Sequence, residues 1–430
     1  MSRRGWHARL SNGLDVIGEH LPGAGLVALR LRVSAGARHE GLHEQGAAHF
    51  LEHTTVQASN GKLHTAFNML GAELHANTSP DETCYFVYVL SDYAPQALTL
   101  LSNMLAPPLE KTCVAERHVI LQEIERAYDT PVVALYKRVL ATLFPDHPIG
   151  ADVLGTTASL AALSCSNLMD FWRRRYSPKH MTLAIIGGWS PEMASSVTEA
   201  CSWPNSNRDG EVKDTLPQAQ PLVRWVHKPA LTQQYLGMGI AGPGLDIGLA
   251  SYSLPILATV LTGRLNACLR RLGVPAQASA FYVPFDDCGF MFVMLVAPPS
   301  GASVGLQALK MVLKTLSAGH VQDDEWSSAR TQLAVRLALE AESFTLSARN
   351  LIKRWRIARR PMTSTEEMAY VLALQDKDAF EILGQLGPTC CAVTLGSLAE
   401  EGLPELTSLI EASEQVFNSR PMSRTANEQK

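Results

Sequence analysis

The run His49-Phe50-Leu51-Glu52-His53 constrains this chain more than any other part of its sequence. On a helix, residues four apart lie one turn apart on the same face, so the imidazoles of His49 and His53 can reach one metal ion. Glu52 then projects beside them, toward the open position of the metal. A helix that carries these three residues without binding metal is the alternative. The prediction of a zinc site therefore depends on a third ligand elsewhere in the chain.

That ligand is predicted in the segment 116–126, which has the pattern of an amphipathic helix. Its buried side is predicted to carry three aliphatic residues: Val119, Ile120 and Ile124. Glu116 and Glu123 are seven residues apart and share a face, so if Glu123 binds the metal, Glu116 can hydrogen-bond a histidine ligand. Glu125 points elsewhere. Taken alone, these glutamates are typical of a solvated helix face.

These two segments resemble the pitrilysin and insulinase peptidases, a family of inverted H-x-x-E-H zinc peptidases. The small members similar to the mitochondrial processing peptidase β subunit are the nearest in pattern. Further matching runs follow in the family's order, at residues 12–14, 34–40, 147–150, 154–156 and 175–178. The resemblance implies that His49, His53 and Glu123 bind one zinc ion per chain. It also implies Glu52 as the general base and Glu116 as the hydrogen-bond partner of a ligand.

The two halves of the chain run parallel in sequence. Strand-like residues 84–90 align with 290–296, on either side of a polar, turn-rich segment. The pattern predicts an α+β fold of two homologous domains, each an antiparallel sheet packed with helices. The family resemblance implies the same fold, and a clam-like chamber enclosed with a partner subunit. The predicted ranges are a domain at 1–203, a linker at 204–218, a second domain at 219–415 and a polar tail at 416–430.

The duplication also predicts that the second half holds no metal. Shifting the motif by the offset between the halves places His49 on Ser251, Glu52 on Leu254 and His53 on Pro255. None of these three replacements is a zinc ligand.

Such a site predicts peptide-bond hydrolysis, because zinc lowers the pKa of its bound water while Glu52 takes up the proton. Residues 74–79 resemble the family's edge strand, whose backbone pairs with an extended substrate. His75, Ala76 and Asn77 are therefore predicted to bind the peptide substrate. The family usually has Asn and then an aromatic residue where this chain has His75 and Asn77. Backbone pairing with the substrate is expected to survive this change, whereas the sequence does not specify the pocket for substrate side chains.

The second half departs further from the family. Active relatives carry an Arg and, seven residues later, a Tyr that hold the substrate. Here Arg270 matches, but Ala276 stands where the Tyr is expected, with one residue deleted. A surface charge is the alternative for Arg270. Because some small members of the family work as heterodimers, this chain is predicted to be the zinc subunit, with a homologous partner that supplies the Arg/Tyr pair.

Composition describes a globular protein of 430 residues, with 46% hydrophobic and 18% charged residues and a net charge of −4. No basic tract predicts binding to nucleic acid, and no apolar stretch is predicted to span a membrane. A cytoplasmic protein is the expectation. The eight cysteines contain no C-x-x-C pair, which predicts reduced, mostly buried thiols.

Two classes of function remain open. The first is a zinc endopeptidase that trims a ribosomally made precursor, such as that of pyrroloquinoline quinone, which the resemblance to small paired relatives implies. The second is a non-catalytic assembly subunit, like the core proteins of the respiratory bc complex. The intact set of His49, Glu52, His53 and Glu123 favours the enzyme, because an assembly subunit has no need of all four.

Overall fold

The structure, a computed structural model of the chain, describes residues 4–57, 62–189, 192–203, 218–317, 321–386 and 389–398, together with 406 and 409. It divides into two compact units of three segments each. The first unit comprises Met1–Asp129, His147–Thr215 and Ala334–Tyr370. The second unit comprises Thr130–Asp146, Leu216–Leu333 and Val371–Lys430. Residues 204–217 of the predicted linker and the whole predicted tail lie outside the described residues.

A six-stranded sheet organises the first unit, in the order β1-β2-β6-β3-β5-β4. Its strands are β1 (Arg4–Arg9), β2 (Asp15–His20), β3 (Leu26–Val33), β4 (His75–Thr78), β5 (Thr83–Leu90) and β6 (Met181–Gly187). Neighbouring strands are antiparallel except β2 and β6, which pair in parallel. The antiparallel sheet predicted from the sequence is thus corrected to a mixed one. The parallel pair arises because a long helical segment carries the chain back before β6 enters beside β2.

Five strands form the sheet of the second unit, in the order β7-β11-β8-β10-β9. They are β7 (Val223–His227), β8 (Gln234–Pro243), β9 (Gln277–Pro284), β10 (Cys288–Ala297) and β11 (Cys390–Gly396). This order matches β2-β6-β3-β5-β4 strand for strand, and β11 pairs with β7 in parallel as β6 does with β2. The aligned runs 84–90 and 290–296 lie in β5 and β10, which hold corresponding places. The predicted duplication is confirmed.

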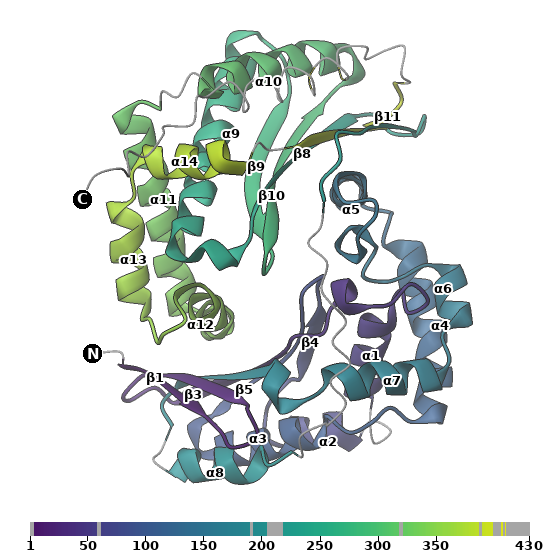
Figure 1. Cartoon of the computed structure of the whole chain (residues 1–430), viewed down its shortest axis with the longest axis vertical. Coiled ribbons are helices and arrows are strands. Elements are labelled where there is room, and N and C mark those ends of the chain that lie inside the picture. Colours follow the sequence, from purple (N-terminus) through teal and green to yellow (C-terminus); the bar gives the residue numbers. More distant parts are fainter. Residues whose placement is uncertain are drawn as a thin grey trace, which may run out of the picture. The chain divides into compact units, whose positions relative to one another are not determined.

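Side chains alternate across the first sheet and supply two layers of core. Val27, Leu29 and Leu31 of β3 belong to the main core, whereas Ala28 packs with Ile352 of α12 on the other face. Figure 1 shows α3 and α8 on one side of this sheet and α12 on the other. The helices of the unit are α1 (Ala47–Val56), α2 (Lys62–Met69), α3 (Ala94–Asn103), α4 (Glu110–Arg126), α6 (Thr157–Ala162), α7 (Cys165–Arg175), α8 (Glu192–Ala200) and α12 (Phe344–Ala358). Short 3-10 turns are η1 (Ala37–His39), η2 (Ser91–Tyr93), η3 (Pro148–Gly150) and η4 (Pro178–His180).

Helix α5 packs on the second sheet, although it comes from the first half of the sequence. Gly237 and Gly239 of β8 allow its close approach, because an added Cβ would lie 2.7 and 2.8 Å from side-chain carbons of Val139. In return, α12 from the second half packs on the first sheet. The compact units therefore depart from the ranges 1–203 and 219–415 by one exchanged segment each. The remaining elements are α5 (Pro131–Leu143), α9 (Ser253–Arg271), α10 (Ala302–Ser317), α11 (Asp323–Glu342), α13 (Ser364–Ala373), α14 (Asp376–Leu386), η5 (Leu245–Tyr252) and η6 (Pro299–Gly301).

One stretch, Leu245–Arg271, is long and apolar enough to cross a membrane by length and composition, with a mean hydropathy of 1.4. That no stretch of the chain spans a membrane stays a prediction. In the structure 56% of its most apolar window is buried, and Leu257, Leu261 and Leu265 belong to the core. A core helix that is apolar on most sides has this same composition.

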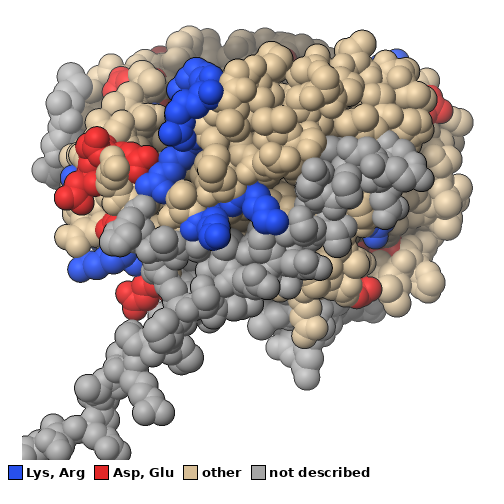
Figure 2. All heavy atoms as spheres, turned by 90° about the horizontal axis from the view of Figure 1, so that it is seen from above, with Lys and Arg blue, Asp and Glu red and all other residues tan. Residues whose placement is uncertain are grey.

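Charge on the surface is mixed in sign. Figure 2 shows Lys and Arg side chains in small separate groups on one face, with Asp and Glu nearby and uncharged residues over most of the coloured surface. A nucleic-acid-binding face would instead gather Lys and Arg into a continuous stripe or patch. That the chain binds no nucleic acid stays a prediction.

Two cysteines are paired. Cys113 of α4 and Cys165, the first residue of α7, form a disulfide across 52 residues of sequence. The prediction that all cysteines are reduced is therefore wrong for this pair. The other six are free and buried, as predicted: Cys84, Cys201, Cys268, Cys288, Cys390 and Cys391. Spacing could not reveal the pair, because only the packed helices bring these two residues together.

Candidate metal centre

Helix α1 begins at a fixed point. Its N-cap, Gly46, has a φ of 91°, and a Cβ there would lie 3.1 Å from the Cα of Gly155. The buried carboxylate of Glu40 accepts hydrogen bonds from the backbone N–H groups of Gly46 and Ala48, each at 2.8 Å. These are among the N–H groups that a helix start leaves open. Burial raises the pKa of Glu40 to about 8, against these two hydrogen bonds, which favour its ionised form.

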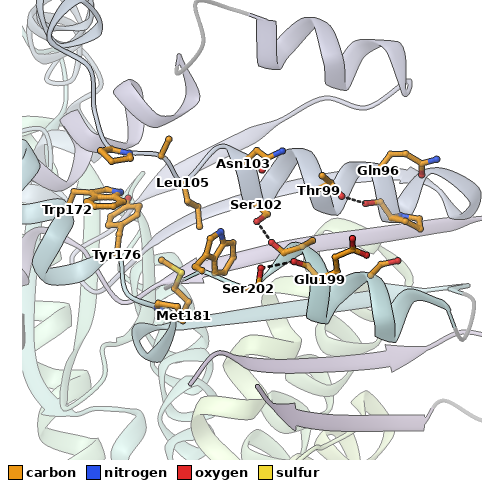
Figure 3. Close-up of a pocket in the computed structure, with 17 residues that line it drawn as sticks. Gln96, Thr99, Ser102, Asn103, Leu105, Trp172, Tyr176, Met181, Glu199 and Ser202 are labelled. Carbon is orange, nitrogen blue, oxygen red and sulfur yellow. Dashed lines mark hydrogen bonds between the residues drawn. The ribbon is translucent and has the colours of Figure 1, made fainter. Parts of the chain in front are cut away.

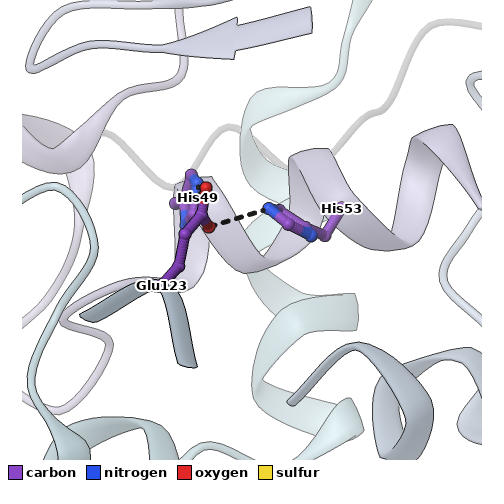
Figure 4. A group of neighbouring side chains, drawn as sticks. All are labelled: His49, His53 and Glu123. Carbon is purple, nitrogen blue, oxygen red and sulfur yellow. Dashed lines mark ion pairs between the residues drawn. The ribbon is translucent and has the colours of Figure 1, made fainter. Parts of the chain in front are cut away.

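His49, His53 and Glu123 converge on one point, as Figure 4 shows. Nε2 of His49 lies 3.6 Å from Oε2 of Glu123, and Nε2 of His53 lies 3.4 Å from the same oxygen. One ligand atom from each residue lies within 4.8 Å of the other two. Within the described part of the chain, no other group of three His, Cys, Asp or Glu side chains is this close. Two imidazoles and one carboxylate form a donor set that catalytic zinc binds, with a fourth position left open.

Glu116 orients one of these histidines. Its Oε2 lies 3.0 Å from Nδ1 of His53, and the carboxylate is buried. If Nδ1 carries the hydrogen, the lone pair of Nε2 is available for a metal ion. Burial on its own lowers the pKa of His53, but hydrogen bonds to Glu123 and Glu116 outweigh it and raise the pKa overall. The residues present therefore fit a zinc ion, which would oppose protonation of the ring.

Glu52 lies beside the cluster and is buried, with 8% of its surface exposed. The hydroxyl of Thr78, the last residue of β4, donates a hydrogen bond to its Oε2. Burial raises the pKa of Glu52, and the hydrogen bond from Thr78 acts in the opposite direction. A carboxylate whose pKa is raised by burial is a stronger base than an exposed one.

Helix α4 presents the two site glutamates from one face, as predicted. Glu125 is exposed and stands outside the cluster. The predicted buried side is correct for Ile120, which is fully buried. It is wrong for Val119, whose exposed fraction is 48%. Val119 faces solvent because the buried side of the helix runs through Glu116 and Ile120, which are four residues apart.

Strand β4 is one of the two edge strands of the first sheet and carries three of the predicted substrate-binding residues: His75, Ala76 and Asn77. His75 and Asn77 point to one face and Ala76 to the other. The ring of His75 stacks on Phe86 with centroids 5.0 Å apart, and Asn77 accepts a hydrogen bond from Arg30. Among the described strands, β4 pairs only with β5, so its outer backbone edge is open to an added strand. Their role in substrate binding stays a prediction.

Arg270 lies in the last turn of α9 and is exposed, and Ala276 lies in the loop before β9. Both belong to the second unit. Substrate binding by Arg270 stays a prediction. The residues aligned with the motif lie in η5 and in the first turn of α9: Ser251, Leu254 and Pro255. That the second half binds no metal stays a prediction.

A separate cavity of about 820 Å³ opens between α3 and α8 in the first unit. Figure 3 shows Trp172 and Tyr176 at one end and Gln96 at the other. Ser102 donates a hydrogen bond to the backbone carbonyl of Ala200 and ties the two helices together. The lining includes neither Glu52 nor any residue of the metal cluster, so this cavity is distinct from the candidate centre.

Two groups at the centre were not foreseen from the sequence, Thr78 and Glu40. Thr78 could have been found from strand alternation, since it shares a face of β4 with Ala76 and that face lies against α1. Glu40 offers a weaker signal, an acidic residue shortly before a helix that lacks a Ser, Thr, Asp or Asn cap.

Comparison with known proteins agrees with this geometry. The sequence profile described as "Insulinase (Peptidase family M16)" matches residues 15–157, and that described as "Peptidase M16 inactive domain" matches residues 162–333. An uncharacterized zinc protease of Mycobacterium leprae is 30% identical over 355 residues, which cover 77% of this chain and 78% of that protein.

Solved structures share the fold. An M16-like peptidase from Alicyclobacillus acidocaldarius superposes with a TM-score of 0.81 at 21% identity, over 92% of this chain and 99% of that one. A chain of complex III from Candida albicans superposes with a TM-score of 0.80 at 15% identity, over 95% and 99%. At these identities the two likenesses concern the fold alone.

Proposed function

We propose a specific activity for this chain, which belongs to the insulinase (M16) family of zinc metallopeptidases: it cleaves internal bonds of extended peptides, as the zinc-binding member of a pair of subunits. Three residues would hold one zinc ion per chain: His49, His53 and Glu123.

One observation carries the proposal. The open edge strand β4 ends at the metal cluster, where Thr78 is hydrogen-bonded to Glu52. An extended peptide that adds to β4 by backbone pairing would therefore run past the candidate base and the three ligands. Pairing through the backbone holds a chain along its length and does not require a terminus, which favours internal cleavage.

The chain's own residues divide the chemistry between them. When bound, zinc lowers the pKa of a coordinated water and polarises the scissile carbonyl. The carboxylate of Glu52 would accept a proton from the attacking water and return it to the leaving amine. Glu116 holds the ring of His53 in the orientation that zinc requires. Burial of Glu52 excludes bulk water and strengthens its electrostatic interactions.

A second subunit follows from the second half of the chain. Ala276 cannot hold a substrate as the Tyr of active relatives does, because a methyl group offers no hydrogen bond. A homologous partner that carries the Arg/Tyr pair would supply that contact. Backbone pairing depends little on substrate side chains, so an unstructured ribosomal precursor peptide, such as that of pyrroloquinoline quinone, is the substrate class that we propose.

The alternative is a non-catalytic assembly subunit that keeps only the fold. The likeness to a chain of complex III concerns the fold and does not favour that role over the enzyme. The cluster opposes it, since a subunit without chemistry has no reason to keep a buried carboxylate beside three metal-binding groups.

Peptides blocked at both ends test the proposal. The zinc-loaded chain, alone and mixed with a candidate partner, is incubated with an acetylated and amidated unstructured peptide, and mass spectrometry identifies the products. Internal cuts that a chelator abolishes are expected. Cleavage only of unblocked peptides, at their ends, would replace the endopeptidase by an exopeptidase. If the chain retains no zinc after loading and is inactive both alone and with the partner, the result would favour the assembly subunit.

A further inference from the structure

Glu52 and Thr78 come from different elements, the helix α1 and the edge strand β4, and are 26 residues apart in sequence. Their hydrogen bond is a direct link between the strand proposed to hold the substrate and the carboxylate proposed to act as base. It can therefore affect the position of the carboxylate relative to the substrate, as well as the local stability of α1 and β4.

The direction of this hydrogen bond follows from the carboxylate of Glu52, which when ionised has no hydrogen to donate. Oγ1 of Thr83 lies 3.4 Å from Oγ1 of Thr78 and 2.7 Å from the backbone carbonyl oxygen of Ala35, to which it donates. A hydroxyl has one hydrogen to donate. An ionised carboxylate can only accept, so the Thr78 hydroxyl gives its hydrogen to Glu52; Thr83, whose hydrogen goes to Ala35, has none to give to Thr78. The carboxylate thus receives a donor whose orientation is determined.

The hairpin that carries Thr78 is held firmly. The backbone N–H of Ser79 donates to the carbonyl of Glu82 at 2.8 Å across the turn. Asp81 in the turn forms ion pairs with Arg38 at 3.0 Å and with Arg356 at 3.2 Å, and the side chains of Asp81 and Arg38 are almost fully buried. Ion pairs from two different segments leave the turn little freedom, so the Thr78 hydroxyl is a fixed point.

Pairing with β4 would also set the position of the substrate relative to Thr78. A peptide paired with β4 takes its register from the backbone of that strand, residue by residue. The hydrogen bond from Thr78 would hold the Glu52 carboxylate in a set position relative to β4, and so relative to the paired peptide. A general base must lie within hydrogen-bond reach of the proton that it removes, and a misplacement of about 1 Å can cost on the order of 10²-fold in rate.

We infer that Thr78 is a positioning residue, which holds the carboxylate of Glu52 in register with the substrate strand on β4. This inference rests on the proposed peptidase activity. It assigns Thr78 no contact with the reacting atoms.

Two substitutions at this position test it. Thr78→Val keeps the shape of the side chain and removes the donor, and is expected to lower kcat by about 10-fold or more, with KM and zinc content unchanged. Thr78→Ser restores a hydroxyl and is expected to recover most of the rate. Thr83→Val, on the opposite strand of the same hairpin, removes a hydroxyl that serves Ala35, and is expected to lower the unfolding temperature while kcat changes less than about 2-fold.

A double-mutant cycle separates positioning from general damage. Thr78→Val added to Glu52→Gln is expected to have little further effect, because the group that Thr78 positions is already changed. A crystal structure of metal-free Thr78→Val gives a readout that needs no activity, and the carboxylate of Glu52 is expected to leave its wild-type position.

Three results would overturn the inference: a wild-type kcat in Thr78→Val, an equal loss in both backgrounds, or an unmoved carboxylate. An inactive wild-type chain that stays inactive with its partner would instead contradict the proposed function.

Discussion

Nδ1 of His53 lies 3.0 Å from the carboxylate of Glu116, and Nε2 of the same ring faces Glu123 at 3.4 Å. The two nitrogens of one imidazole thus face two glutamates of one helix, α4. In the tautomer with its hydrogen on Nδ1, the ring donates to Glu116, and Nε2 keeps its lone pair for a metal ion. The arrangement follows from a spacing of seven residues, or two helical turns.

Glu116→Gln is expected to weaken zinc binding by about 10-fold, because it removes the charge that holds the His53 ring without removing a ligand. Competition with a chromophoric chelator measures the affinity. Glu125→Gln is the matched control, since it makes the same change on an exposed part of the same helix. An equal effect of the two substitutions would contradict the role given to Glu116.

The chain purified alone is expected to bind zinc but to cleave an unstructured peptide slowly, because Ala276 replaces the substrate-holding Tyr. Mixing with a homologous chain that carries the Arg/Tyr pair is expected to raise kcat/KM by about 10²-fold or more, since correct positioning of the carbonyl is restored. Size-exclusion chromatography of each sample measures association. Full turnover by a lone monomer would end the proposal of a pair.

Acid is expected to destabilise the first unit through Glu82. Burial on its own would raise the pKa of this carboxyl, but Arg32 and Arg356 outweigh it and hold the pKa below the ordinary value of 4.5. The folded-state pKa is lower than the unfolded one, so the stabilisation is complete above 4.5 and is lost as the pH falls through the folded value.

Unfolding temperatures from pH 7 down to about pH 3 test this, with Glu82→Gln compared with the exposed Glu73→Gln. The first variant should be less stable at neutral pH and should lose less stability in acid than wild type. Parallel curves for wild type and Glu82→Gln would show that the Arg32 and Arg356 pairs do not control the acid response.

Removal of the disulfide by Cys113→Ala with Cys165→Ala is expected to cost about 4 kcal/mol of stability, the loop-closure value for a separation of 52 residues. Chemical denaturation measures it. Reductant should destabilise wild type to a similar degree and leave the double variant unchanged. A reductant effect of equal size on both proteins would mean that the disulfide is not its target.

Local patterns specified the centre well. Helical periodicity alone places His49 beside His53 and Glu116 on the same face as Glu123. Helical periodicity does not reveal the hydrogen bond from Thr78, because it joins α1 to another element, and only the alternation of side chains along β4 points to it. Val119 was misplaced for a related reason, since an aliphatic residue on an amphipathic helix is buried only where another element covers it.

The sequence predicted the elements of the fold, but not which sheet each helix covers or the direction in which every pair of strands runs. Repeated strand patterns predicted two related halves, and the strand orders β2-β6-β3-β5-β4 and β7-β11-β8-β10-β9 confirm them. The exchange of α5 and α12 was not predictable, because an apolar helix face does not specify which sheet will cover it. The parallel pairing of β2 with β6 was missed likewise, since strand direction depends on the path of the helices between them.

Glu52→Gln gives the most direct test of the central claim, that Glu52 is the general base beside a zinc ion held by His49, His53 and Glu123. Zinc content by elemental analysis and cleavage of a blocked peptide are measured on the same samples of wild type and variant, each with the partner that gives full activity. The variant is expected to keep about one zinc per chain while cleavage falls by at least about 10²-fold, because the base is lost and the ligands remain. Loss of zinc from the variant, or cleavage at the wild-type rate, would contradict the account.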